Sequence, residues 1–125
     1  MIKVIPIDEI LKNSDIVTMH CPLNKDSELM CNKEFFSKMK KDSMFINTSR
    51  GGVVNEEDLV MALNNGVIGK AALDVIKDSV LLKAKNLVIT PHAAWAPVET
   101  RTRLVKIVSE NLKKWLAGTP INVIE

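Results

Sequence analysis

Short apolar runs alternate with amphipathic stretches along the chain, and this alternation constrains the fold more than any other feature of the sequence. Strands are typically short runs rich in β-branched residues, whereas helices place apolar residues at i, i+3 and i+4. These patterns predict strands at 16–19, 44–46, 71–73 and 87–89, and helices at 7–11, 33–39, 56–64 and 97–116. Alternating strands and helices favour βα units and a parallel sheet. We therefore predict an α/β fold with four parallel strands and a long C-terminal helix.

Several residues are typical of helix ends and sharpen these boundaries. Asn32 and Asn55 are predicted N-caps, because asparagine side chains accept hydrogen bonds from the free N–H groups of a first turn. Asp8 is predicted to cap the first helix in the same way. Gly118, followed by Pro120, is predicted to end the last helix, which Pro97 begins.

Size and charge limit the class of protein. The 125 residues fit a single domain, residues 1–125, and 46% of them are hydrophobic. The net charge of +2 is too small to indicate binding to nucleic acid or to an anionic membrane. No apolar run approaches the roughly 20 residues of a membrane span. The only cysteines, Cys21 and Cys31, are not in a CxxC pair, and the sequence predicts no metal site. These features predict a cytoplasmic protein.

Polar side chains follow each predicted strand at the point where the strand ends. They lie at 20–22 (His-Cys-Pro), at 47–50 (Asn-Thr-Ser-Arg), at Asp74 and at 90–92 (Thr-Pro-His). Parallel strands bring their carboxyl ends to one edge of a sheet, where ligands bind in open α/β folds. The sequence therefore predicts a small-molecule site at this edge.

Two of these residues have side chains suited to chemistry on an organic acid. Arg50 precedes two glycines and can bind a carboxylate through two parallel hydrogen bonds. His92 can transfer a proton near neutral pH. Each residue taken alone also fits a structural interpretation: a surface arginine before a turn, a structural histidine and, for Asp74, a helix cap or turn residue.

The order of the motifs is more specific than any one of them. In chain order they are SDIV (14–17), HCPL (20–23), INTSRGG (46–52), ALDV (72–75), NLVITPH (86–92), ENL (110–112) and GTPINV (118–123). So ordered, they resemble the D-isomer-specific 2-hydroxyacid dehydrogenase family, and HAAWA (92–96) resembles its glycerate dehydrogenase and hydroxypyruvate reductase branch. The resemblance implies a truncated NAD-binding domain: a partial Rossmann-like, three-layer unit with a mostly parallel sheet.

The resemblance also implies roles for individual residues. Arg50 would bind the substrate carboxylate and carbonyl, and His92 would be the general acid and base. Asp74 would hold the nicotinamide carboxamide, beside the backbone near Thr48. The remaining implied cofactor-binding residues are Ser49 and, on the adenine side, His20, Cys21 and Pro22. The cofactor would be NAD or NADP and the substrate a small 2-hydroxy or 2-keto acid such as glycerate or hydroxypyruvate.

The sequence departs from the family pattern in two places. The pyrophosphate-binding motif G-x-G-x-x-G does not occur, because the first glycine is Gly51. The family also pairs its catalytic histidine with a glutamate, but no glutamate lies between Glu57 and Glu99, which leaves Asp78 as a candidate replacement. We therefore expect this chain to bind dinucleotide weakly or not at all, and to be inactive by itself.

Two other interpretations remain open. In the first, the chain is a non-enzymatic binding or assembly module linked to a dinucleotide. In the second, it is part of an enzyme that a second chain completes. In either case we expect a homo-oligomer or association with a chain that supplies the missing half, because a shortened sheet leaves strand edges unpaired.

Overall fold

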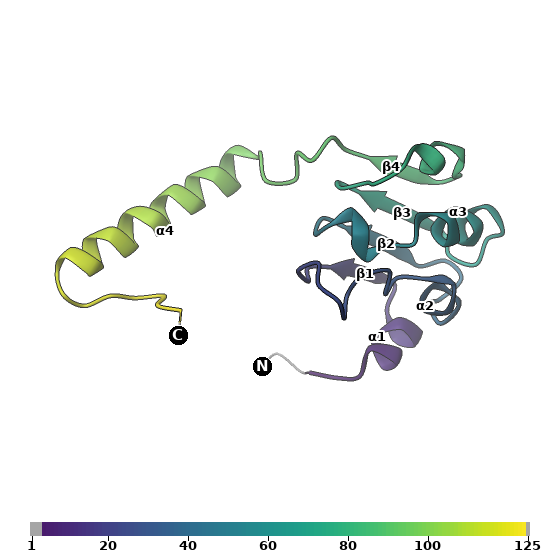
Figure 1. Ribbon diagram of the computed structural model, residues 1–125, viewed down its shortest axis with the longest axis horizontal. Coiled ribbons are helices and arrows are strands. Elements are labelled where there is room, and N and C mark those ends of the chain that lie inside the picture. Colours follow the sequence, from purple (N-terminus) through teal and green to yellow (C-terminus); the bar gives the residue numbers. More distant parts are fainter. Residues whose placement is uncertain (1–3, 125) are drawn as a thin grey trace. The chain divides into compact units, whose positions relative to one another are not determined.

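The computed structural model describes residues 4–124 and divides into two units, Met1–His92 and Ala93–Glu125 (Figure 1). The first unit contains the sheet and the shorter helices. The second contains one long helix, α4 (Val98–Leu116). The α/β fold class predicted from the sequence is confirmed.

All four strands of the first unit form one parallel sheet. They are β1 (Ile16–Met19), β2 (Met44–Asn47), β3 (Lys70–Leu73) and β4 (Leu87–Ile89). Their order in the sheet, β1-β2-β3-β4, follows the chain. Each predicted strand is confirmed to within a residue at either end, because a short apolar run bounded by turn residues is a local signal for a strand.

The helices of the first unit begin at residues that satisfy their free N–H groups. In α2 (Lys33–Ser37), the Asn32 side chain accepts hydrogen bonds from the N–H groups of Glu34 and Phe35. In α3 (Glu56–Asn64), the Asn55 side chain accepts one from Asp58 N–H. Both predicted caps are confirmed, since this interaction is local in sequence. Two short 3₁₀ helices, η1 (Gly51–Val53) and η2 (Ser79–Lys83), were not predicted.

The predicted cap of the first helix is wrong. Helix α1 (Ile7–Asn13) begins after Pro6 and has no side-chain cap. The Asp8 carboxylate instead pairs with Lys38 Nζ at 3.1 Å, and Lys38 also pairs with Glu34 at 2.8 Å. Hydrogen bonds to Glu34 and then to Asp8 raise the pKa of Lys38 above its usual value. This ion pair joins α1 to α2, a contact between residues distant in sequence.

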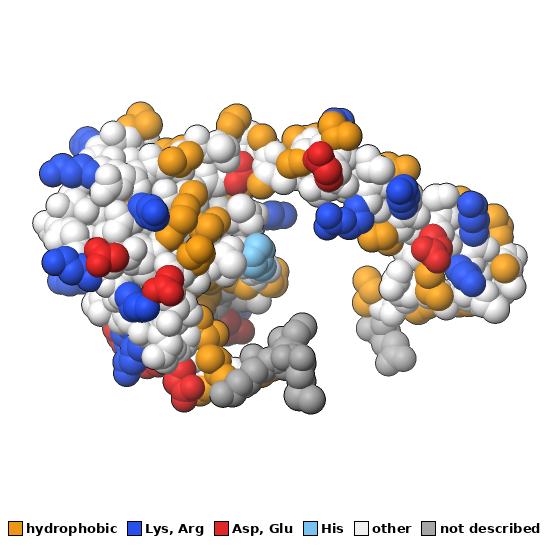
Figure 2. Space-filling view, turned by 180° about the vertical axis from the view of Figure 1, so that it is seen from behind, with side chains coloured by type: hydrophobic (Ala, Val, Ile, Leu, Met, Phe, Trp, Pro, Cys, Tyr) orange, Lys and Arg blue, Asp and Glu red, His pale blue; other side chains and the backbone are white. Residues whose placement is uncertain are grey.

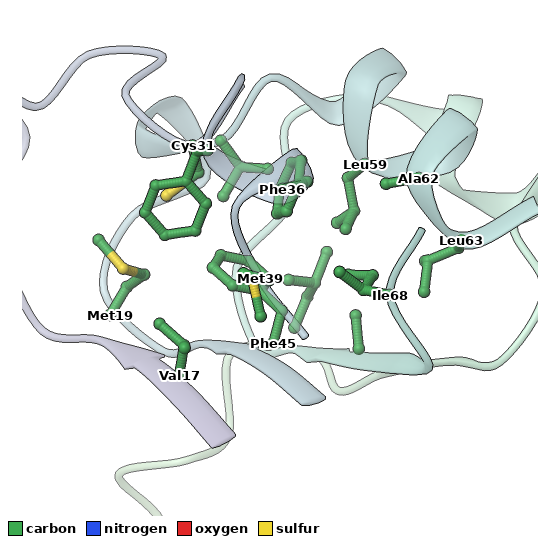
Figure 3. Close-up of a cluster of buried hydrophobic side chains, with 14 of the residues drawn as sticks. Val17, Met19, Cys31, Phe36, Met39, Phe45, Leu59, Ala62, Leu63 and Ile68 are labelled. Atoms are coloured by element: carbon green, nitrogen blue, oxygen red, sulfur yellow. The ribbon is translucent and has the colours of Figure 1, made fainter. Parts of the chain in front are cut away.

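The hydrophobic core lies between one face of the sheet and the helices (Figure 3). Val17 and Phe45 point from the strands towards Phe36 of α2 and Leu59 of α3. The rings of Phe36 and Phe45 meet edge to face with centroids 5.2 Å apart, a favourable arrangement for aromatic pairs. This packing fixes the strands against the helices and so fixes the strand ends that carry the predicted site.

The other face of the sheet is partly exposed within the first unit. Side chains alternate between the two faces of a strand, so the partners of the buried residues lie on this second face. Ile16 on β1 is 59% exposed and Val88 on β4 is 61% exposed, while Met44 and Ile46 of β2 are half-buried. These strands therefore present apolar side chains on both faces, of which the helices cover one.

The second unit consists of α4 and the segment that follows it. None of the residues of α4 is buried, and its apolar side chains alternate with lysine and arginine along the helix (Figure 2). Gly118, predicted from the sequence to end this helix, follows it with a φ of +73°, the left-handed conformation that glycine adopts readily. Among residues 4–124, no helix is long and apolar enough to span a membrane.

Candidate functional site

The four strands point the same way, so the residues that follow them share one edge of the sheet. The carboxyl ends are Met19, Asn47, Leu73 and Ile89, which are adjacent across the sheet. All eight predicted site residues lie within three residues after one of these ends, at His20, Cys21, Pro22, Thr48, Ser49, Arg50, Asp74 and His92. The predicted placement at one edge therefore agrees with the topology.

A groove of about 580 Å³ lies at the ends of β1 and β2. Six of the predicted site residues line it together with Leu23: His20, Cys21, Pro22, Thr48, Ser49 and Arg50. The β1 side of the groove is ordered by local hydrogen bonds. Thr18 Oγ1 lies 2.9 Å from His20 Nε2, and Ser27 Oγ donates to the Pro22 carbonyl at 2.6 Å. The groove is therefore a formed surface with a cationic side chain, Arg50, at its β2 side.

Asn47 organises the loop that presents Arg50. Its side chain is fully buried and makes three hydrogen bonds. Asn47 Oδ1 accepts from Ser49 N at 2.9 Å and from Ser49 Oγ at 2.8 Å, and its Nδ2 donates to the Arg50 carbonyl at 2.9 Å. The Arg50 guanidinium donates to the Ser49 carbonyl at 2.7 Å. The loop is thus fixed from within, while the Arg50 side chain remains exposed.

A second hollow, of about 430 Å³, lies at the ends of β3 and β4. Asp74 and His92 line it, together with Val75, Ile76, Ile89, Thr90 and Pro91. Asp74 is buried, and its carboxylate accepts a hydrogen bond from Thr90 Oγ1. His92 is exposed and has a φ of +54°, a conformation in which histidine is enriched among residues other than glycine. This hollow therefore contains a buried carboxylate and an accessible imidazole.

Backbone hydrogen bonds connect the strand ends across the two cavities. Asp74 N donates to the Asn47 carbonyl at 2.9 Å, and His92 N donates to the Asp74 carbonyl at 2.9 Å. His92 N also donates to Thr90 O at 3.0 Å. The backbone positions of Asn47, Asp74 and His92 are thus linked in series. This series joins the loop that carries Arg50 to the residue predicted to move protons.

The structure brings the predicted residues to one edge but divides them between two cavities. Arg50 lines the groove, whereas Asp74 and His92 line the neighbouring hollow. Asp78, the candidate replacement for the family's glutamate, lines neither cavity, and its carboxylate accepts a hydrogen bond from Ser79 Oγ at 3.3 Å. Asp74 is the acidic residue that lines the hollow with His92. Direct contact of Arg50 and His92 with one substrate remains a prediction.

Two residues that support the site were not singled out from the sequence. Asn47 belongs to a recognised polar cluster, and its position before Thr-Ser-Arg is a usable signal, because asparagine often bonds to the backbone two residues ahead. Glu56 carries no such signal. Its buried carboxylate bonds to Lys77 and Asp78, more than 20 residues away in the sequence.

The two cysteines differ sharply in environment. Cys21 is half-buried at the groove, whereas Cys31 is fully buried in the core. Burial, and secondarily the nearby Cys21, raise the pKa of Cys31 from 9.0 to about 12. The thiolate is the reactive form of cysteine, so Cys31 is unreactive at ordinary pH.

We expect one fast-reacting thiol in the folded chain. At pH 8, Ellman's reagent should label Cys21 first and Cys31 only after unfolding. The raised pKa of Cys31 also means that unfolding releases its proton once the pH exceeds 9.0. The free energy of unfolding should therefore fall by about 1.4 kcal/mol per pH unit from there towards pH 12. In a Cys31→Ala variant, this fall in the free energy of unfolding above pH 9.0 should be missing. Two thiols that react equally fast in the native chain would contradict the assignment of Cys31 as the unreactive thiol.

The comparison with protein families agrees with this geometry. Residues 1–94 match the family model described as the D-isomer specific 2-hydroxyacid dehydrogenase, NAD binding domain. The chain belongs to this family. Membership identifies the edge that carries Arg50, Asp74 and His92 as part of a dehydrogenase's NAD-binding domain, and the cofactor class as a nicotinamide dinucleotide.

Curated members of the dehydrogenase family are similar over nearly the whole chain. The hydroxypyruvate reductase of Blautia hydrogenotrophica is 45% identical over 126 residues, which cover 96% of this chain and 39% of that protein. The glycerate dehydrogenase of Methylorubrum extorquens is 40% identical, covering 97% of this chain and 41% of that protein. The chain therefore spans about two fifths of the length of these relatives.

A solved dehydrogenase confirms the fold. The D-isomer specific 2-hydroxyacid dehydrogenase of Lactobacillus delbrueckii ssp. bulgaricus, in its NAD-complexed form, is 29% identical, with a TM-score of 0.73. The match covers 92% of this chain and 40% of the other.

The side chains at this edge fit one end of the family's dinucleotide. A buried carboxylate is suited to accept a hydrogen bond from an amide N–H. A guanidinium is suited to bind a carboxylate, and an imidazole is suited to exchange a proton with an oxygen atom. The sequence G-x-G-x-x-G, whose backbone N–H groups hold a pyrophosphate, does not occur in the chain. The residues present therefore fit the nicotinamide end and not the pyrophosphate.

Proposed function

We propose that this chain is the part of a dehydrogenase that carries Arg50, Asp74 and His92 for the reduction of a small 2-keto acid, such as hydroxypyruvate, or the reverse oxidation. One observation carries the proposal: all three residues follow parallel strands at one edge and line two adjacent cavities there. The similarity to a hydroxypyruvate reductase and a glycerate dehydrogenase supports this substrate class.

Each residue then has one task. The Arg50 guanidinium binds and orients the substrate carboxylate through paired hydrogen bonds. The His92 imidazole gives a proton to the substrate oxygen during reduction and takes it back during oxidation. The Asp74 carboxylate accepts an N–H bond from the carboxamide of the cofactor. The nicotinamide, when bound, supplies or accepts the hydride.

The proposal also includes the expectation that these 125 residues do not turn over substrate by themselves. A pyrophosphate needs several backbone N–H donors and a helix N-terminus, and the usual glycine motif for both is absent. In a fluorescence titration, NADH should therefore bind the isolated chain weakly or not at all. A micromolar dissociation constant would contradict this expectation.

A chimeric enzyme tests the catalytic assignment. The matching segment of the Blautia hydrogenotrophica hydroxypyruvate reductase is replaced by this chain, which is 45% identical to it. We expect the chimera to oxidise NADH in the presence of hydroxypyruvate. His92→Gln in the chimera should lower kcat by roughly 10²-fold or more, because the proton donor is lost.

Two controls make this result specific. Lys85→Gln in the same chimera replaces an exposed residue that lines neither cavity, and should leave kcat within about threefold, because it touches neither the substrate nor the cofactor residues. Chimera activity that survives His92→Gln unchanged would contradict the role of His92. A folded chimera that binds NADH but reduces no 2-keto acid would contradict the proposed substrate class.

A further inference from the structure

Three acidic residues occupy the first turn of α3, and one of them differs from the others. Glu57 is exposed and Asp58 is half-buried, whereas Glu56 is only 7% exposed. Acidic residues are favoured at a helix N-terminus by the helix dipole, which does not require burial. The dipole therefore does not account for the position of Glu56.

The Glu56 carboxylate holds the segment that follows β3. Its Oε1 accepts a hydrogen bond from Lys77 N at 2.5 Å, and its Oε2 accepts one from Asp78 N at 2.7 Å. Residues 75–78 belong to no helix or strand, so no ladder of backbone bonds fixes them. Because each oxygen binds one of two successive N–H groups, the carboxylate fixes both the position and the orientation of this segment. Hydrogen bonds to an ionised acceptor are stronger than hydrogen bonds to a neutral one.

The same segment packs against the loop that carries Arg50. A Cβ atom on Gly51 would lie 2.9 Å from the carbonyl carbon of Ile76 and 3.2 Å from Lys77 N, so the two backbones touch and only glycine fits. Arg50, directly before Gly51, lines the groove. Ile76 lines the hollow that contains Asp74 and His92. The contact between Gly51 and Ile76 thus joins the loop at the wall of the groove to the wall of the hollow.

We propose that Glu56 is a positioning residue, whose carboxylate clamps residues 76–78 against Gly51 and so fixes Arg50 relative to Asp74 and His92. Glu56 lines neither cavity and acts through this segment. The inference rests on the proposed function, because a single substrate that contacts Arg50 and His92 requires the two cavities to keep a fixed separation.

The test compares Glu56→Gln with Glu57→Gln in the full chain. Glutamine matches the size of glutamate but has one carbonyl oxygen, so it can accept only one of the two bonds and turns its own N–H₂ towards the other donor. Glu57→Gln makes the same charge change one residue later, at an exposed position. By hydrogen exchange measured by NMR, the Lys77 and Asp78 amides should exchange about tenfold faster in Glu56→Gln and at wild-type rates in Glu57→Gln.

A ligand titration gives the functional readout. D-glycerate is added while the NMR signals of the Arg50 guanidinium and the His92 ring are followed. In the wild-type chain, both signals should shift with one dissociation constant. In Glu56→Gln, binding should weaken by roughly fivefold or more, with unequal responses from Arg50 and His92. Wild-type affinity in Glu56→Gln would overturn the positioning role, and wild-type exchange at Lys77 and Asp78 would overturn the clamp.

The failure of the proposed function has a different signature. If the wild-type chain shows no response to D-glycerate, that substrate class fails for the isolated chain. The clamp is then judged from two further amides: His92 N, which donates to Asp74 O, and Val53 N, which donates to Arg50 O. If the His92 and Val53 amides exchange faster in Glu56→Gln but not in Glu57→Gln, the result supports a positioning role across the two cavities. Unchanged exchange of these amides in Glu56→Gln would overturn that role.

Discussion

Replacing Asn47 with alanine is expected to lower the free energy of unfolding by about 2–4 kcal/mol. The Asn47 side chain is 0% exposed and satisfies Ser49 N, Ser49 Oγ and the Arg50 carbonyl. Each buried polar group that loses its partner costs about 1–3 kcal/mol, although water entering the space left by the side chain offsets part of the sum. Chemical denaturation followed by circular dichroism measures the change.

Asn64→Ala is the matched control. Asn64 also makes two side-chain hydrogen bonds, to Lys83 O at 3.2 Å and from Lys85 N at 2.9 Å, but it is exposed. Water can replace these bonds, so we expect a loss below about 1 kcal/mol. Equal losses in the two variants would show that burial of Asn47 contributes nothing. Because Asn47 fixes the loop before Gly51, its loss should also broaden the NMR signal of the Arg50 guanidinium.

The purified chain is expected to self-associate at micromolar concentration. Strands β1 and β4 form the two edges of the sheet, and the face that the helices of the first unit leave uncovered exposes apolar residues at Ile16 and Val88. Unpaired strand edges and exposed apolar surface favour pairing with a second chain. Sedimentation velocity should therefore give a mass that exceeds 13.9 kDa and rises with concentration.

A lysine on the edge strand should oppose this association. Ile16→Lys places a charge on β1, where it would be buried against a partner, and should weaken association by roughly tenfold or more. Leu82→Lys is the control, because Leu82 is 78% exposed on η2, outside the sheet. It should leave association unchanged. A constant mass of 13.9 kDa for the wild-type chain at every concentration would contradict the prediction.

The sequence predicts the elements and the edge that carries the site because both depend on local signals. Asn32 and Asn55 cap helices by accepting hydrogen bonds from N–H groups two or three residues ahead, and short apolar runs identify the strands. The same local reasoning fails for Asp8, because Lys38 binds it from a position 30 residues away. Local sequence signals also do not predict the left-handed conformation of His92.

The sequence also does not predict that the site is divided into two cavities. The motifs place Arg50 and His92 after strands, and the parallel sheet then brings both to one edge. Their separation depends on the approach of Gly51 to Ile76 and on the carboxylate of Glu56. These are tertiary contacts between a turn and an irregular segment, and neither residue type nor spacing identifies such contacts.

The strand order has a consequence for how the chain acquires its fold. Each strand pairs with the strand that precedes it in the sequence, through a single crossover. Contacts between segments close in sequence lower the entropy lost in folding and favour rapid folding. The sheet can therefore assemble through pairs of strands that are neighbours in the sequence. The groove beside Arg50 needs only the ends of β1 and β2, whereas the hollow that contains His92 needs the ends of β3 and β4.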